Sequence, residues 1–189
     1  MIGIPFMLAF ALRNDGWYLR QDIIWHKPNP MPESVRDRCT KAHEYIFLLS
    51  KSKKYYYDNI AIKEPVKQDW GTRNRAAGKY HNAGTGLQPH SGLTKSYTTK
   101  NKRSVWSITN KPYKHAHFAT FPPDLIEPCI LAGSKEGDIV LDPFMGSGTT
   151  AMVSKQHNRH YIGCELHEDY GELIQNRMPP EILSQDIEL

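Results

Sequence analysis

The pattern of hydrophobic and polar positions predicts regular elements at both ends of the chain. Residues 1–15 are rich in apolar side chains and close with a helix-stop signature at residues 14–16, which predicts a helix. The segments Trp17–Trp25 and His43–Ser50 are dense in apolar side chains and have the length of strands. We also expect a strand at Tyr55–Asp58, forming a hairpin with the strand before it.

The last third of the chain predicts alternating helices and strands. Ile139–Leu141 is a short apolar run, typical of a buried strand, and Pro143 cannot continue a central ladder. A second strand is expected at His160–Cys164. The expected helices are Leu125–Ala132, capped by Asp124 and ended by Gly133, then Ala151–Gln156 and His167–Met178.

A glycine turn links the first of these strands to its helix, with the sequence Asp-Pro-Phe-Met-Gly-Ser-Gly-Thr-Thr over residues 142–150. It lacks the third glycine of a dinucleotide fingerprint and the Lys of a phosphate loop. Asp142 would repel a phosphate but attract an ammonium group, and Glu165 after the next strand suits two ribose hydroxyls. The turn therefore predicts a positively charged nucleoside as ligand, with an ordinary strand-to-helix turn as the alternative.

Length and composition set limits on the size of the domain, its core and its cellular compartment. The chain's 189 residues suggest one domain with an insertion, or one and a half domains, and a mean hydropathy of -0.59 indicates a modest core without membrane segments. A signal peptide is not expected, because Ile2–Leu12 lacks a basic leader and a small-residue cleavage site. Cys39, Cys129 and Cys164 are too widely spaced for a zinc or disulfide pattern, so a reducing cytoplasm is expected.

The charge is unevenly spread. Residues 65–115 hold ten Lys and Arg against one Asp, although the whole chain carries only +4. Aromatic side chains are interleaved and hydrophobic periodicity is absent, which favours a nucleic-acid contact region that becomes ordered on a duplex. A flexible surface insertion is the alternative.

Residues 142–150, followed by Ile-Gly-Cys-Glu at 162–165, resemble the S-adenosylmethionine site of DNA amino-methyltransferases, which methylate the exocyclic amine of adenine or cytosine. Residues 22–30 and 43–49 are similar to the middle of that family, and residues 117–122 resemble its second cofactor motif. The motif order looks like that of the beta group. The resemblance implies an α/β, Rossmann-like methyltransferase sheet with helices on both faces and a basic, loop-rich insertion.

The resemblance also implies a division of the chain. Residues 1–64 would supply the strands and helix of the catalytic half, and residues 65–115 a variable target-recognition insertion. Residues 116–178 would form the half that binds S-adenosylmethionine, and residues 179–189 a tail. The implied setting is a prokaryotic or phage-type cytoplasm, and methyl transfer needs no metal.

The cofactor residues implied by the resemblance surround the glycine turn. They are Phe118, Ala119, Phe121, Asp142, Pro143, Phe144, Gly146, Ser147, Gly148, Thr149, Thr150, Glu165 and Leu166. Asp142 would lie near the amino-acid portion and Glu165 would hold the ribose. The alternatives are a helix-capping Asp, a surface Glu, hydroxyls that only cap a helix, and phenylalanines that only pack the core.

The expected contacts with double-stranded DNA are basic. They are His26, Lys27, Arg36, Arg38, Arg73, Arg75, Lys100, Lys102 and Arg103. His26 is equally compatible with a structural role, and most of the others are expected to be solvated.

The catalytic loop of the family, Asp/Ser/Asn-Pro-Pro-Tyr/Trp, has no match here. The Pro-Pro pairs at 122–123 and 179–180 belong to the cofactor motif and to a helix end, so the catalytic residues are unknown. We therefore expect a truncated or split enzyme with an incomplete sheet, completed by an N-terminal fragment or a homodimer. The alternatives are an inactive DNA-binding or cofactor-binding remnant and, with less support, an RNA or small-molecule methyltransferase.

Overall fold

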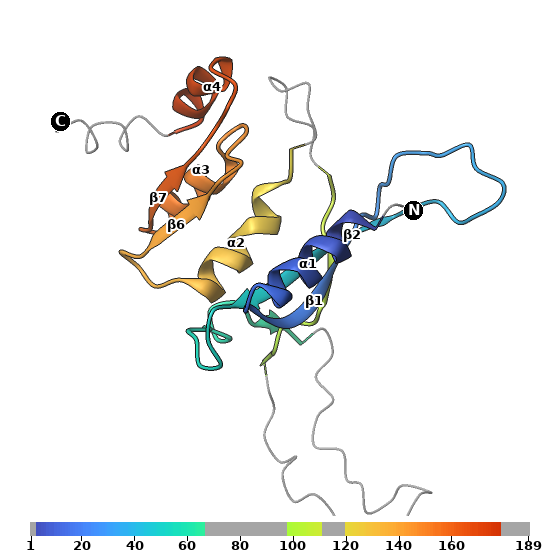
Figure 1. Cartoon of the computed structure of the whole chain (residues 1–189), viewed down its shortest axis with the longest axis horizontal. Helices are drawn as coiled ribbons and strands as arrows, with labels where there is room; N and C mark the ends of the chain where they lie inside the picture. The colour runs from blue at the N-terminus through green and yellow to red at the C-terminus, as the bar shows by residue number, and fades with distance from the viewer. Residues whose placement is uncertain (1–2, 67–97, 111–119, 179–189) are drawn as a thin grey trace, which may run out of the picture.

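The computed structural model describes residues 3–66, 98–110 and 120–178, which form an α/β arrangement (Figure 1). The helices in these segments are α1 (Ile4–Asn14), α2 (Pro123–Gly133), α3 (Thr149–Gln156) and α4 (Asp169–Arg177). The strands are β1 (Tyr18–His26), β2 (His43–Ser50), β3 (Glu64–Pro65), β4 (Thr99–Lys100), β5 (Val105–Ser107), β6 (Ile139–Asp142) and β7 (His160–Gly163). None of these helices has the length and hydrophobicity needed to cross a membrane.

Strand β1 is the centre of a three-stranded sheet with the order β2-β1-β5. It pairs antiparallel with β2 and parallel with β5. Alternate side chains of these strands are buried on one face, where Ile23, Trp25 and Trp106 pack with Leu125 of α2. This core holds α2 against the sheet.

Strands β6 and β7 form a separate, two-stranded parallel sheet in which Asp142 lies opposite Gly163. Helix α3 packs on both strands and on α2, so that α2 lies between the two sheets (Figure 1). A second core of Met145, Ala151 and Met178 connects the turn after β6 to α3 and to the end of α4. The carboxyl ends of β6 and β7 therefore meet at one edge, beside the glycine turn.

Two apolar surfaces stay exposed in the described structure. Ile139 and Leu141 on β6 are 63% exposed and Ile162 on β7 is 53% exposed, because these side chains point away from α3. Helix α1 exposes Ile4, Met7, Leu8 and Phe10.

The predicted strand at Tyr55–Asp58 is wrong. These residues form no strand, and β2 pairs instead with β1, which comes before it in the chain. The Asp58 carboxylate accepts the backbone N–H groups of Ile60 and Ala61, and the Asp58 N–H donates to Ala132 O at 2.9 Å. This local turn and the contact with the end of α2 draw the segment away from β2.

The other predicted elements are confirmed, with shifted ends. Gly16 follows α1 with φ +97°, as a helix stop requires. The prediction that Asp124 caps α2 is wrong, because α2 begins at Pro123 and Asp124 lies in its first turn. There an acidic side chain faces the positive end of the helix dipole, which explains the cap-like sequence pattern.

Candidate functional site

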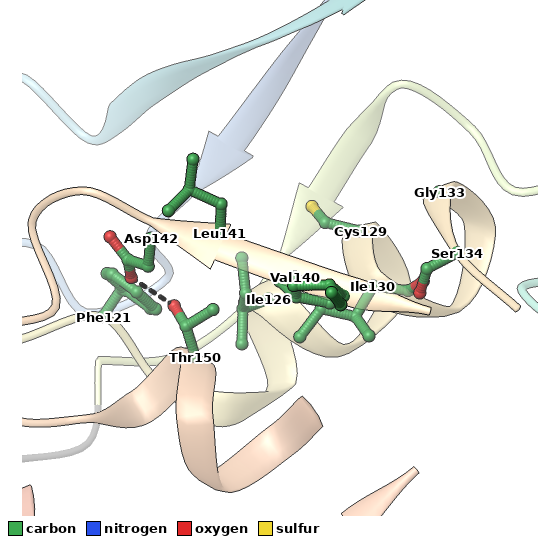
Figure 2. Close-up of a pocket in the computed structure, with 11 residues that line it drawn as sticks. Phe121, Ile126, Cys129, Ile130, Gly133, Ser134, Val140, Leu141, Asp142 and Thr150 are labelled. Atoms are coloured by element: carbon green, nitrogen blue, oxygen red, sulfur yellow. Dashed lines mark hydrogen bonds between the residues drawn. The ribbon is translucent and has the colours of Figure 1, made fainter. Parts of the chain in front are cut away.

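Asp142 ends β6 with both carboxylate oxygens engaged. Oδ1 accepts the Phe144 N–H at 3.0 Å, and Oδ2 accepts the Thr150 hydroxyl at 2.6 Å (Figure 2). These bonds fix the carboxylate at the carboxyl end of the strand. Asp142 does not cap α3, because Gly148 occupies the N-cap position and no side chain caps that end of the helix.

Glu165 lies two residues after β7 and faces the same turn. Its Oε2 accepts the Gly146 N–H at 2.8 Å, and its Oε1 accepts the His167 N–H at 2.9 Å. The His167 backbone N–H, followed by that of Gly146, holds the pKa of Glu165 below its usual range. Two carboxylates thus lie at the ends of neighbouring parallel strands, one on each side of the glycine turn.

The members of the turn divide into inward and outward groups. Ser147, Gly148, Thr149 and Thr150 are buried. By contrast, Pro143, Phe144, Glu165 and Leu166 are exposed, and Gly146 is half-buried. The exposed group, together with Asp142, therefore forms the surface that a ligand can reach, and the buried hydroxyls serve the turn itself.

A cavity of about 490 Å³ lies between α2 and β6 and reaches this turn (Figure 2). Phe121, Ile126, Val140, Asp142 and Thr150 belong to its lining. Phe121 also packs against the core of the first sheet, which is the alternative role considered for it. Phe118 and Ala119 lie outside the described residues.

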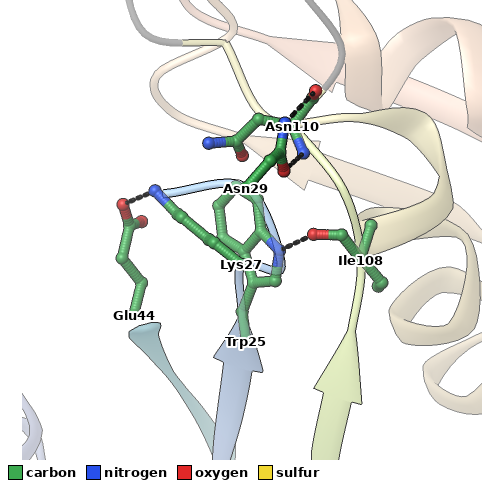
Figure 3. Close-up of polar contacts among 6 residues, drawn as sticks. All are labelled: Trp25, Lys27, Asn29, Glu44, Ile108 and Asn110. Atoms are coloured by element: carbon green, nitrogen blue, oxygen red, sulfur yellow. Dashed lines mark hydrogen bonds and ion pairs between the residues drawn. The ribbon is translucent and has the colours of Figure 1, made fainter. Parts of the chain in front are cut away.

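A polar cluster occupies the carboxyl ends of β1 and β5 (Figure 3). Lys27 makes an ion pair with Glu44 and its Nζ lies 4.3 Å from the centre of the Trp25 ring. The Trp25 indole donates to Ile108 O at 2.9 Å. The Lys27 side chain is only 18% exposed, so its charge is balanced within the protein and is poorly placed for a phosphate.

The same cluster continues along the two segments that leave these strands. Asn29 Nδ2 donates to Asn110 O at 3.3 Å, and Asn29 Oδ1 accepts the Asn110 N–H at 3.1 Å. This reciprocal pair ties the proline-rich loop to the segment after β5. His26 Nδ1 lies 3.1 Å from Ser107 Oγ, at the end of the paired strands.

The remaining basic residues are dispersed. Lys100 and Arg103 both approach Glu64 Oε1, at 3.5 and 2.9 Å. Partial burial raises the pKa of Glu64, but the hydrogen bond and charge of Arg103 outweigh it and leave that pKa below its usual range. Lys102 lies over the Trp106 ring.

Arg36 and Arg38 are exposed in the loop between β1 and β2, which projects away from the sheet in Figure 1. Arg38 pairs with Glu33 at 3.3 Å and with Asp37 at 3.6 Å. Arg73 and Arg75 lie outside the described residues. Within the part of the chain that the structure describes, no group of three or more His, Cys, Asp or Glu side chains is arranged for a metal ion.

Two contacts from α4 were not predicted from the sequence. Arg177 donates to both the carbonyl and the hydroxyl of Ser147, at 3.2 and 2.7 Å. Ile174 packs beside Gly148, within 3.4 Å of the position that a Cβ there would occupy. The only sequence signal was a basic residue at the end of a helix, which does not reveal its partner.

The model of a family described as DNA methylase matches residues 3–176. The chain belongs to this DNA methylase family. It is 49% identical over 181 residues to the type II methyltransferase M.Cfr9I of Citrobacter freundii, covering 96% of this chain and 51% of the relative. It is also 49% identical over 178 residues to the type II methyltransferase M.SmaI of Serratia marcescens, covering 94% of this chain and 52% of the relative.

The solved structures agree with this fold. The crystal structure of the M1.HpyAVI–SAM complex aligns with a TM-score of 0.62 at 24% identity, over 94% of this chain and 71% of that chain. The expected α/β methyltransferase fold is confirmed. This methylase chain spans about half the length of the relatives it matches in sequence.

Proposed function

We propose that the chain supplies the cofactor-binding and DNA-facing parts of a DNA amino-methyltransferase, which transfers a methyl group from S-adenosylmethionine to the exocyclic amine of adenine or cytosine. The observation that carries this proposal is the pair of carboxylates at Asp142 and Glu165, on either side of the glycine turn. They end adjacent parallel strands, the place where α/β sheets bind nucleosides.

The donor set fits the cofactor. The Asp142 carboxylate attracts the ammonium of the amino-acid portion, and the ionised Glu165 accepts hydrogen bonds from the ribose hydroxyls. Each of these oxygens accepts a hydrogen bond from the protein and has a further lone pair that a ligand can use. Exposed Phe144 and Leu166 offer apolar surface beside them. Phe118, Ala119 and Phe121 complete the pocket in this proposal.

The bound cofactor supplies an electrophilic methyl group, and the rest of the site must present the amine in line with it. The target base is extruded from the duplex, which costs a few kcal/mol. Residues 65–115 contact the DNA, with Lys and Arg on phosphates. The cytoplasm of a prokaryote or a phage host is the proposed setting.

A complementary segment carries the Pro-Pro loop and covers the two exposed apolar surfaces. The support is the exposure of Ile139, Leu141 and Ile162 on one face of β6–β7, and the exposed face of α1. Branched side chains on strands are normally buried in parallel sheets. Homodimerisation through the same surfaces is the second possibility, and light scattering of the chain alone distinguishes the two.

The first experiment measures binding of S-adenosylmethionine to the chain by calorimetry. Asp142→Asn and Glu165→Gln should each weaken binding by about tenfold or more, the factor that corresponds to roughly 1.4 kcal/mol. Glu136→Gln is the matched control, because Glu136 is an exposed carboxylate just before the opposite end of β6. An equal loss of affinity in the control, or an affinity that none of the three substitutions changes, contradicts the assignment of this site.

The second experiment follows transfer of labelled methyl to mixed DNA, with the chain alone and with a co-expressed segment carrying the Pro-Pro loop. Activity only with the added segment supports the proposal. Activity of the chain alone would show that another residue accepts the amine hydrogens. If the cofactor binds but no methyl is transferred with or without the added segment, the chain is better explained as an inactive remnant of such an enzyme. Transfer to RNA or a small molecule instead of DNA favours an RNA or small-molecule methyltransferase.

A further inference from the structure

The glycine turn is held from outside its own strand and helix. Met145 N–H donates to Cys164 O at 2.9 Å, which ties the start of the turn to the end of β7. Its middle is tied to α4, where Arg177 Nη1 reaches both Ser147 oxygens. Ser147 is only 6% exposed, so its hydroxyl is directed into the protein and not toward a ligand.

We propose that Arg177 is a positioning residue for cofactor binding, which acts by fixing Ser147 and through it the neighbouring Gly146. This inference rests on the proposed function. One guanidinium nitrogen bonds both the carbonyl and the hydroxyl of Ser147, so the peptide and the side chain are oriented together. The next residue back, Gly146, donates its N–H to Glu165, the carboxylate assigned to the ribose.

Removal of the Arg177 guanidinium would change the position of Glu165 through Ser147 and Gly146. Without the guanidinium, the buried Ser147 hydroxyl and carbonyl lose a charged donor, and a buried polar group without a partner is costly. The turn would rotate to hydrate these oxygens. Gly146 has φ +54° and no close contact on its Cβ side, where Phe144 O would lie 3.9 Å away, so it offers little resistance to that rotation. The Glu165 carboxylate would then lose one of the N–H groups that orient it and would keep that of His167.

Arg159 provides a matched control in the same half of the molecule. It is a buried Arg that also bonds a serine, donating to Ser134 O at 2.8 Å and to Ser134 Oγ at 3.2 Å. Those contacts join α2 to the turn before β7 and do not touch the glycine turn. A substitution there destabilises the fold without altering Ser147.

The test compares Arg177→Met, Arg177→Lys, Ser147→Ala, the Arg177→Met/Ser147→Ala double variant and Arg159→Met in the full chain. Calorimetry gives the dissociation constant for S-adenosylmethionine, and thermal melting gives stability. We expect Arg177→Met to weaken binding about tenfold, as one charge-assisted hydrogen bond permits. Arg177→Lys should recover part of this loss, and the double variant should be no worse than Arg177→Met, because both changes remove one interaction.

Arg159→Met should lower the melting temperature at least as much as Arg177→Met while leaving the dissociation constant within about twofold. A normal dissociation constant in Arg177→Met, full additivity with Ser147→Ala, or an equal binding loss in Arg159→Met would each overturn the inference.

Amide hydrogen exchange of the unliganded chain separates this inference from the proposed function. Arg177→Met should speed exchange in peptides covering residues 144–149, and Arg159→Met should not. If the wild-type chain fails to bind S-adenosylmethionine, the proposed function falls, while faster exchange in Arg177→Met still supports the hold on the turn. Unchanged exchange refutes that hold whatever the cofactor does.

Discussion

Replacing Gly148 by Ala tests the glycine turn most directly. Gly148 has φ +78° and ψ +22°, a left-handed conformation that side chains disfavour. A Cβ built there would lie 3.1 Å from Ile174 Cγ1, 3.2 Å from Cγ2 and 3.4 Å from Cα. The substitution therefore strains the backbone and also presses the turn against α4.

The two effects have separate magnitudes. The left-handed conformation costs a non-glycine residue roughly 1–2 kcal/mol. Overpacking in a tight contact typically adds about 1–3 kcal/mol, and the lower part of that range is appropriate where the neighbour can shift by a few tenths of an ångström. We expect Gly148→Ala to lower the free energy of unfolding by about 2–4 kcal/mol, and the melting temperature by about 5–15 °C for a chain of this length.

The assay is thermal unfolding followed by circular dichroism, with Gly146→Ala as the matched control. Gly146 has φ +54°, but its Cβ would meet only Phe144 O, at 3.9 Å. The control therefore carries the backbone cost without the contact with Ile174. In an Ile174→Ala background, which removes both Cγ atoms, the cost of Gly148→Ala should fall to that of Gly146→Ala.

Two outcomes would refute this reasoning. Equal destabilisation by Gly148→Ala and Gly146→Ala would mean that α4 does not press on the turn. If neither substitution lowered the melting temperature, the left-handed turn itself would be wrong.

Three further predictions concern charged groups. Because its pKa is lowered, Glu165 stays ionised through the ordinary Glu range. Cofactor affinity measured against pH should therefore weaken only as the pH falls through that lowered pKa, with a smaller acid loss in Glu165→Gln. Glu64→Gln releases Lys100 and Arg103, so fluorescence anisotropy should show tighter duplex binding, with a salt slope steeper by about one unit per phosphate gained; weaker binding would contradict this. Arg159→Met leaves the buried Ser134 carbonyl without its charged donor and should lower the free energy of unfolding in denaturant by about 2–3 kcal/mol, with Arg159→Lys intermediate.

The elements around the glycine turn could be predicted because their signals are local. A short apolar run, a proline, two glycines and a carboxylate after each strand specify strand, turn, helix and strand without knowledge of distant partners. Tyr55–Asp58 was mispredicted because its aromatic residues favour strands in isolation, whereas β2 has its partner in β1. Strand pairing is a tertiary choice that local propensity does not encode.

The sequence predicts which residues lie at the candidate site, but it does not predict the directions of their side chains. Asp142 and Glu165 follow strands, so their place at the sheet edge comes from topology alone. The inward direction of Ser147 depends on Arg177, which lies 30 residues later in the chain. Similarly, the ion pair between Lys27 and Glu44 forms only when β1 and β2 pair. The order of charges along the sequence does not reveal it.

Under the proposed function, the contacts of the glycine turn predict that cofactor binding and methyl transfer can be separated. Every hydrogen bond that holds Asp142, Gly146, Ser147 and Glu165 in place comes from β6, β7, α3, α4 or the turns between them. These four residues are therefore held in place by contacts within the chain itself. The opposite face of β6–β7 instead exposes branched apolar side chains. If a complementary segment covers that face and carries the amine acceptor, as proposed, it leaves the turn unchanged. It should then raise the rate of methyl transfer far more than the affinity for the cofactor.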